Sequence, residues 1–386
     1  MPNSVVVTGE DPSGRPIVSV VAIMRYDISP AGRCIPLGPL RSDLQSEIME
    51  YTGIVYPGKF HPPLLKRDID CYVWRGHTDI IVQGTVRTEQ PVQSLPVDLA
   101  CAGSQVRFEL NVVATGDRWV EHGPAGLRLT SPEPFTEMPM RYDRAYGGFD
   151  AHAETKFTDP AELAEMCMMS GQTDERIASD YAYPRNPAGK GYLVDLDGAH
   201  GLPWPNLEFP GERLSLSHLA APMDQWGRRP YPACFAWFSH AWFPRIGFLG
   251  VLPVVQDDKI PDAELRMGLF NDGFPDASLF EPVDHAYAQG AHPYLRRHRL
   301  VGDEKIRITN MSLDARDFHL HLPASPPKIF IRQFSDSERS APTVLDCVFV
   351  ETDLNQVSLI WRGTLPAAQP HLPRGWHQFY EARVVW

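Results

Sequence analysis

The segment Thr78-Asp-Ile-Ile-Val-Gln-Gly-Thr-Val-Arg87 is rich in β-branched residues and partly alternates between polar and apolar positions. A period of two is the pattern of a strand that buries one face. A second segment, Gln105-Val-Arg-Phe-Glu-Leu-Asn-Val-Val113, has the same character. Together they predict a mainly β fold.

The C-terminal part of the chain alternates more cleanly. Strands are predicted there at Lys305–Thr309, Phe318–Leu322, Lys328–Arg332, Val344–Glu351 and Gln356–Arg362. Turn signals stand at Ser325-Pro-Pro327 and Asp353–Asn355, where proline and Asx residues favour chain reversal. We expect an antiparallel meander in this region.

Proline shapes the rest of the chain, which has 386 residues, 37 of them proline, with 43% hydrophobic and 10% aromatic residues. Proline is about twice as frequent as its usual ~5%. Long helices are excluded because each internal proline removes a backbone donor, while the apolar content is sufficient for a core. Between residues 201 and 293, prolines alternate with aromatic residues, which predicts ordered loops pinned by ring packing.

Two segments predict short helices. Asp159-Pro160 combines an N-cap acid with a proline at the first helical position, and helix formers follow as far as Gly171. A second helix is expected from Ser42 to Gly53. We expect antiparallel β-sandwich-like sheets with long ordered Pro/aromatic-rich loops and one or two short helices. The expected regions are a β-rich one (1–150), a helix and loop region (151–293) and the C-terminal meander (294–386), intertwined as one unit.

Charge and hydropathy exclude several classes of partner. The chain has 36 Lys+Arg against 48 Asp+Glu, a formal net charge of −12 at pH 7, which argues against sequence-independent binding to nucleic acid or anionic lipid. Residues 1–11 show no secretory signal, and the longest apolar runs fall short of the ~18–20 residues that span a bilayer. We expect a cytoplasmic protein with no nucleic-acid or membrane partner.

Motifs for metal, nucleotide and hydrolase chemistry are absent from the sequence. There is no G-x-G-x-x-G after a strand, no H-E-x-x-H and no G-x-S-x-G. His319 and His321 share one face of a predicted strand, but two histidines are too few for a metal site. Asp195-Leu-Asp197-Gly198 resembles a fragment of a calcium loop, and we interpret it as a turn. We therefore predict no metal, no cofactor and no catalytic residue.

Two polar segments carry glycines and cations that suit a fixed loop. The first is Met140–Asp150, where Gly147-Gly148 can supply positive φ and Arg144 a rigid fork of donors. The second is Tyr183–Tyr192. We favour a structural role, in which the arginines clamp loop carbonyls or a carboxylate such as Glu208. The alternative is an anion pocket for a small ligand, formed by Arg144, Arg185 and Lys190.

These segments resemble the signature blocks of the bacterial family known as domain of unknown function 2169. The main blocks are Pro139-Met-Arg-Tyr-Asp-Arg-Ala-Tyr-Gly-Gly148, Tyr183-Pro-Arg-Asn-Pro-Ala-Gly-Lys-Gly-Tyr192 and Leu202-Pro-Trp-Pro-Asn-Leu-Glu208. Further blocks follow the expected order: Lys66 to Gly84, Gly116–Trp119, Pro134–Thr136, Trp242-Phe-Pro-Arg245 and Leu300–Glu304.

The resemblance implies a non-enzymatic adaptor or chaperone for a type VI secretion effector, which it would stabilise and help to load onto a spike or PAAR protein. It marks these candidate positions, structural or binding: Tyr142, Arg144, Gly147, Gly148, Arg185, Asn186, Gly189, Lys190, Gly191, Asn206, Glu208, Trp242 and Arg245. The family pattern breaks at Ala236-Trp237. We favour core packing for this aromatic segment, and the alternative is a partner surface at Trp226, Phe235, Trp237 and Phe238.

An alternative from another class is a carbohydrate-active β-sandwich enzyme or sugar-binding protein. In that case tryptophans would stack on sugar rings and a pair of carboxylates would supply acid and base. The candidate tryptophans are Trp204, Trp226, Trp237 and Trp242. A cleft lined by them would favour this hypothesis, and their burial in the core would count against it.

Overall fold

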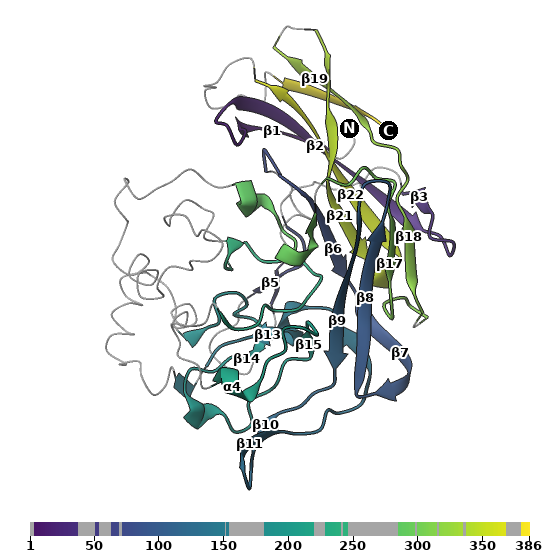
Figure 1. Ribbon diagram of the computed structural model, residues 1–386. Helices are drawn as coiled ribbons and strands as arrows, with labels where there is room; N and C mark the ends of the chain where they lie inside the picture. The colour runs from purple at the N-terminus through teal and green to yellow at the C-terminus, as the bar shows by residue number, and fades with distance from the viewer. Residues whose placement is uncertain are drawn as a thin grey trace, which may run out of the picture.

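Sheets dominate the computed structural model of the chain (Figure 1). The structure describes residues 4–37, 51–53, 63–68, 72–150, 152–153, 181–219, 228–240, 242–245, 285–297, 299–314, 316–334, 337–367 and 380–386. Most strand pairs are antiparallel, so the predicted mainly β fold is confirmed. No helix in these ranges has both the length and the apolar character that a membrane crossing requires.

The largest sheet has seven strands in the order β1-β2-β22-β21-β6-β16, with β3 paired to the end of β2. β21 and β6 are its parallel pair. The strands are β1 (Ser4–Glu10), β2 (Pro16–Ile28), β3 (Cys34–Pro36), β6 (Thr78–Gln83), β16 (Arg296–Arg297), β21 (Thr343–Glu351) and β22 (Gln356–Pro366).

A five-stranded sheet faces it, in the order β15-β9-β8-β17-β18. Val82 and Leu359 of the first sheet and Leu99 and Ile308 of the second belong to one buried cluster, so the two sheets share a core. The strands are β8 (Ser94–Ala102), β9 (Arg107–Thr115), β15 (Leu207–Glu208), β17 (Lys305–Ile308) and β18 (Phe318–His321).

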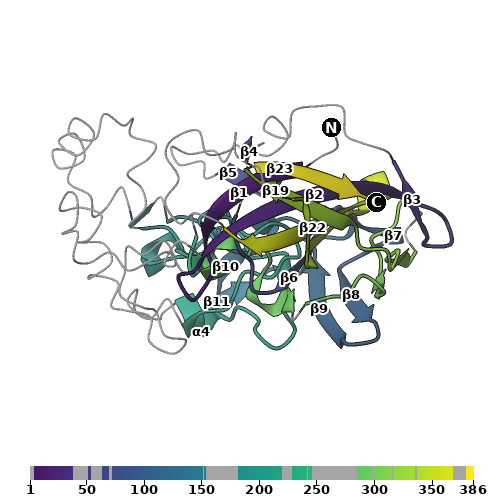
Figure 2. The ribbon, with the colours of Figure 1, turned by 90° about the horizontal axis from the view of Figure 1, so that it is seen from above.

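A three-stranded sheet, β20-β19-β23, covers the outer face of β1, β2 and β22 (Figure 2). Val18 and Val20 pack against Ile329 and Ile331 on that side, while Val21 lies in the shared core. Burial on both faces explains why β2 is an almost continuous apolar run. The strands are β19 (Lys328–Gln333), β20 (Arg339–Ala341) and β23 (Tyr380–Val385).

Gly84 divides the segment that predicted the fold into two strands, β6 and β7 (Thr85–Val92). Its φ is +153°, and a Cβ at this position would lie 1.9 Å from Thr352 Oγ1. The chain therefore leaves the large sheet here, and β7 pairs with β12 (Phe135–Pro139) instead.

The described loops between residues 120 and 295 contain only short elements and have their own aromatic core. Tyr146, Tyr183, Tyr192 and Trp204 lie in one buried cluster, and of these Trp204 belongs to the segment 201–293 for which ring packing is predicted. The elements are η1 (Tyr142–Arg144), β10 (Val120–Gly123), β11 (Gly126–Leu129), β13 (Tyr146–Gly147), β14 (Lys190–Gly191), η4 (Leu196–Gly198), α4 (Leu216–Leu219), η8 (His285–Ala288) and η9 (Pro293–Leu295).

Two predictions need correction. The C-terminal strands do not form one meander, because β17–β18, β19–β20 and β21–β22 join three different sheets. The β21 and β22 strands are buried on both faces and enter the centre of the large sheet, whereas β17 and β18 alternate. Tyr51–Gly53 is not helical but forms strand β4, paired with β5 (Pro63–Leu65). The predicted helix at 159–171 and residues 42–50 lie outside the described residues.

Candidate functional site

The two main signature loops meet side by side. β13 and β14 pair in parallel, with Tyr146 opposite Lys190 and Gly147 opposite Gly191. Asn186 is buried, and its Nδ2 donates to the carbonyls of Tyr142 (2.8 Å) and Tyr146 (3.0 Å). One amide side chain therefore joins the first loop to the second.

The glycines of these loops allow the close approach. Gly147 has φ +147°, and a Cβ there would lie 2.1 Å from the Asn186 carbonyl oxygen. Gly148 and Gly189 both donate their backbone N–H to that same oxygen, at 2.9 and 3.2 Å. Gly191 faces the ring of Pro205. Their placement supports the structural reading of the loops.

The Asp117 carboxylate pairs with a cationic side chain from each loop, Arg144 and Lys190. Its Oδ1 accepts from Lys190 Nζ and Asn206 Nδ2, each at 3.0 Å, and lies 3.6 Å from the Arg144 guanidinium. Burial alone would raise the pKa of the Asp117 carboxyl, but the hydrogen bonds from Asn206 and Lys190 hold that pKa below its usual range. Burial also lowers the pKa of the Lys190 amine, against the opposing effect of Asp117.

Arg185 does not share this carboxylate in any contact of the described residues. Its guanidinium donates to the Arg229 carbonyl at 3.2 Å and stacks 3.9 Å from the centre of the Tyr231 ring. These contacts favour the structural role and contradict the alternative of one anion pocket formed by Arg144, Arg185 and Lys190. Lys190 and Arg144 pair with the Asp117 carboxylate, and Arg185 donates to the Arg229 carbonyl.

Glu208 is buried and paired with a different arginine from those expected. Its Oε2 lies 2.5 Å from Arg118, and its Oε1 accepts from the Leu214 backbone N–H at 3.0 Å. Burial raises the pKa of the Glu208 carboxyl, although Arg118 counteracts the rise. Asn206 ties the same region together, since its Nδ2 also donates to the Thr115 carbonyl at 2.8 Å.

The signature block Trp242–Arg245 also has a structural role. Arg245 is fully buried, and it pairs with Asp68 and donates to the carbonyls of Phe238 and Tyr287, both at 2.7 Å. Tyr142, likewise buried, contacts the Trp242 ring edge-on with ring centres 5.3 Å apart. These buried side chains therefore have a structural role in the core.

The alternative that the aromatic segment forms a partner surface is contradicted by the burial of its described members. Phe235, Trp237 and Phe238 are buried, and Trp226 lies outside the described residues. The Phe235 carbonyl accepts from Val82 N–H of β6 at 2.8 Å, and the Trp237 ring packs on Phe349. The favoured interpretation of this aromatic segment, core packing, is confirmed for these three side chains. Since Trp204 and Trp242 are also buried, these tryptophans cannot stack on a sugar.

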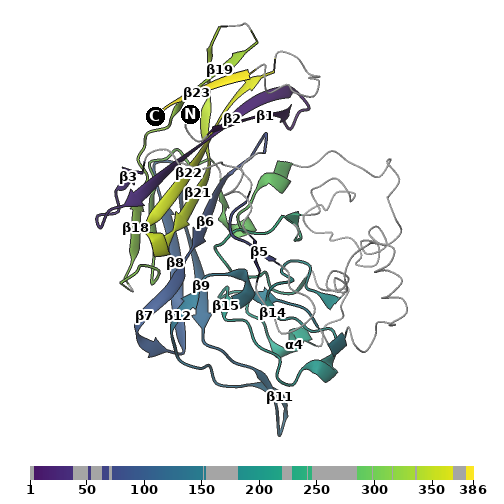
Figure 3. The same ribbon diagram turned by 180° about the vertical axis from the view of Figure 1, so that it is seen from behind.

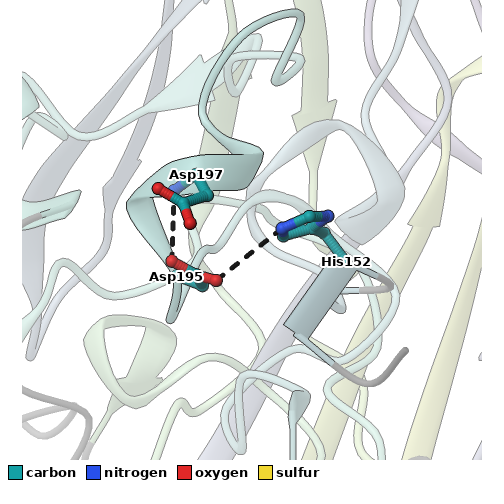
Figure 4. Close-up of side chains that lie close together, drawn as sticks. All are labelled: His152, Asp195 and Asp197. Carbon is teal, nitrogen blue, oxygen red and sulfur yellow. Dashed lines mark hydrogen bonds and ion pairs between the residues drawn. The ribbon is translucent and has the colours of Figure 1, made fainter. Parts of the chain in front are cut away.

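One cluster in the described ranges has the composition of a metal site, namely His152, Asp195 and Asp197 (Figure 4). His152 Nε2 lies 3.7 Å from Asp195 Oδ2. The other oxygen, Oδ1, accepts from the Asp197 backbone N–H at 3.1 Å and caps η4. This bond is the turn contact that the sequence predicts for the Asp195–Asp197 pair.

Three turns from distant parts of the sequence enclose a groove of about 750 Å³, called here the turn groove. Its lining comes from the β2–β3 turn, the β17–β18 loop and the β21–β22 turn: Ile28, Ser29, Pro30, Ser312, Leu313, Asp314, Arg316, Asp317, Phe318, His319 and Asn355. Figure 3 shows β3 beside β18, where Arg33 and His321 form a bridge.

Large apolar side chains are exposed on the segments that form this groove or flank it in the sequence. Leu313 is 53% exposed and Leu354, the neighbour of the lining residue Asn355, is 57% exposed. Ile35 and Leu37, which follow the β2–β3 turn, are 52% and 41% exposed. The sequence did not indicate this surface, because no single segment contains it.

Comparison with known proteins gives one match. A family model described as "Uncharacterized protein conserved in bacteria (DUF2169)" matches residues 13–362. No curated protein and no solved structure matches the chain.

Proposed function

The chain belongs to the DUF2169 family of bacterial proteins, and from this premise we propose that it is a non-enzymatic adaptor for a type VI secretion effector. In this proposal it binds and stabilises the effector in the cytoplasm and helps to load it onto a spike or PAAR protein. The observation that supports it most is the set of exposed apolar side chains around the turn groove.

Exposed leucines on neighbouring turns are typical of an interface. Single apolar side chains on a surface are common, but contiguous ones rimmed by polar groups mark interaction sites. Leu313 and Leu354 supply the apolar part, and Asp314, Arg316 and Asp317 are polar neighbours. This composition matches the apolar centre and polar rim of protein interfaces.

The turns around the groove are internally hydrogen-bonded. Ser312 Oγ accepts from Arg316 N–H and donates to its carbonyl, both at 2.8 Å. Ile28 N–H donates to the Asn355 carbonyl at 2.8 Å, which joins the first turn to the third. A surface that is already ordered loses little conformational entropy when a partner binds, so we assign the effector segment to this groove.

In this proposal the signature blocks and the turn groove have different roles. The described block residues join loops and strands through buried or partly buried contacts. The groove segments at 28–37, 312–319 and 352–355 lie outside these blocks. We infer that the blocks maintain the scaffold and that the turn tips select the effector.

Co-expression tests the adaptor role. We expect the effector encoded beside this gene to co-purify with the chain, and to accumulate as soluble protein only when the chain is present. The measurement is affinity purification of the tagged chain, followed by size-exclusion chromatography. An effector that is equally soluble, stable and secreted after deletion of this chain would contradict the proposal.

A further inference from the structure

The outer edge of strand β18 lies in the turn groove. β18 is the last strand of the five-stranded sheet and forms its ladder with β17. His319 of β18 and Asp317, which precedes the strand, both line the groove. The groove therefore contains a sheet edge in addition to its exposed apolar side chains.

The hydrogen-bond pattern of the ladder shows which backbone groups point out from this edge. Leu322 N–H donates to the Glu304 carbonyl at 2.9 Å, and in an antiparallel ladder every second residue bonds to the partner strand. Leu320 therefore bonds to β17, whereas the backbone groups of Asp317 and His319 point away from it. Within the described residues, the N–H groups of Asp317 and His319 have no acceptor.

Strand β3 lies beside the other part of this edge (Figure 3). His321 N–H donates to the Gly32 carbonyl at 2.7 Å, and Arg33 forms a parallel bridge with His321. The bridge is a single residue pair, because the chain before Arg33 forms a turn in which Gly32 N–H donates to the Ser29 carbonyl at 2.8 Å. In the described part of the chain, residues 317–319 are thus the stretch of the edge that faces the groove.

The backbone groups of this stretch have the spacing of a parallel ladder. The His319 carbonyl lies against the turn, since a Cβ on Gly32 would be 2.9 Å from its oxygen. The Asp317 carbonyl and the His319 N–H remain toward the groove. One residue of an added parallel strand can donate to the first group and accept from the second.

We propose that the effector binds through an extended segment that adds to this edge as a parallel strand. The proposal rests on the adaptor role and specifies how the turn groove recognises the effector. In strand addition, main-chain hydrogen bonds supply affinity, and pockets for alternate side chains supply specificity.

The groove also indicates the side chains of that segment. The exposed Leu313 and the other apolar lining residues suit an apolar side chain. Both lining aspartates already pair with arginines, Asp317 with Arg307 at 3.2 Å and Asp314 with Arg316 at 3.6 Å. We therefore expect a segment without net charge in which apolar and polar residues alternate.

A second copy of the chain is a poorer occupant. Its own β18 would arrive with β3 attached at His321, and residues 317–319 of each strand would be left for pairing. Such a ladder would be shorter than the usual strand of about 5–6 residues.

His319→Pro tests the edge. Proline lacks the N–H that would donate to the effector, and because this N–H takes no part in the ladder with β17, the variant is expected to fold. We expect its affinity for the effector encoded beside this gene to fall at least about tenfold, as measured by biolayer interferometry.

Glu10→Pro is the matched control. β1 is also an edge strand, and because Asp11 N–H donates to the Arg15 carbonyl at 2.9 Å, the Glu10 N–H points away from β2. Glu10 does not line the turn groove, so this variant is expected to bind like the wild type. Equal affinities of the two variants would overturn strand addition and leave the adaptor role standing.

Residue-resolved amide exchange of the wild-type chain gives a second readout. The effector is expected to slow exchange at Asp317 and His319 and to leave Phe318 and Leu320 unchanged, because the latter two already bond to β17. Slowing without this alternation would overturn strand addition, as would a change in the oligomeric state of His319→Pro with normal effector binding, which would assign the edge to a second copy. A wild-type chain that binds no effector would overturn the adaptor role and this inference together.

Discussion

Gly147→Ala is expected to lower the free energy of unfolding by roughly 3 kcal/mol or more. At φ +147° the new Cβ would lie 2.1 Å from the backbone oxygen of Asn186, which cannot move without parting β13 from β14. A displaced Asn186 would also weaken the hydrogen bonds from its Nδ2 that join the two signature loops. Urea unfolding followed by tryptophan fluorescence measures it.

Gly126→Ala is the matched control. Gly126 also has positive φ, at +112°, but no atom lies within 4 Å of the Cβ that alanine would add. This variant carries backbone strain without a collision and is expected to lose only about 1 kcal/mol. Equal losses in the two variants would show that the contact with Asn186 does not decide the stability of the loops.

Leu313→Asp/Leu354→Asp is expected to weaken effector binding about a hundredfold or more, because two carboxylates would be buried against the partner without counter-charges. Both side chains are more than half exposed, so the free chain should melt at an unchanged temperature. Biolayer interferometry with the immobilised effector measures the affinity.

Leu196→Asp controls for the change in charge and hydropathy. Leu196 is 47% exposed on η4 and does not line the turn groove. This variant is expected to bind the effector with the affinity of the wild type. A double variant that also binds normally would exclude the turn groove as the effector site.

Sequence patterns identified strands well where alternation or apolar character was strong. The β17 and β18 strands follow their predicted ranges to within one residue. The assembly of the strands was not predictable, because pairing between distant segments leaves no local pattern. The parallel pair of β6 with β21, and the division of the C-terminal strands among three sheets, are of this kind.

The candidate positions were recognisable from the sequence, but their role was not. Asp117 lies in the block Gly116–Trp119 and yet was not among the expected site residues, although it holds Lys190, Asn206 and Arg144. A partly exposed carboxylate that gathers cations needs the fold to bring them together. The turn groove could not be predicted for the same reason, because three turns that are far apart in the sequence form it.

Hydrogen–deuterium exchange of the full chain, alone and with its effector, tests most directly the claim that the signature blocks build the scaffold and the turn groove binds the partner. The account predicts slower amide exchange on binding in segments 28–37, 312–319 and 352–355. It predicts unchanged exchange in segments 142–148 and 183–192. Protection of the latter segments with no change around the groove would contradict it.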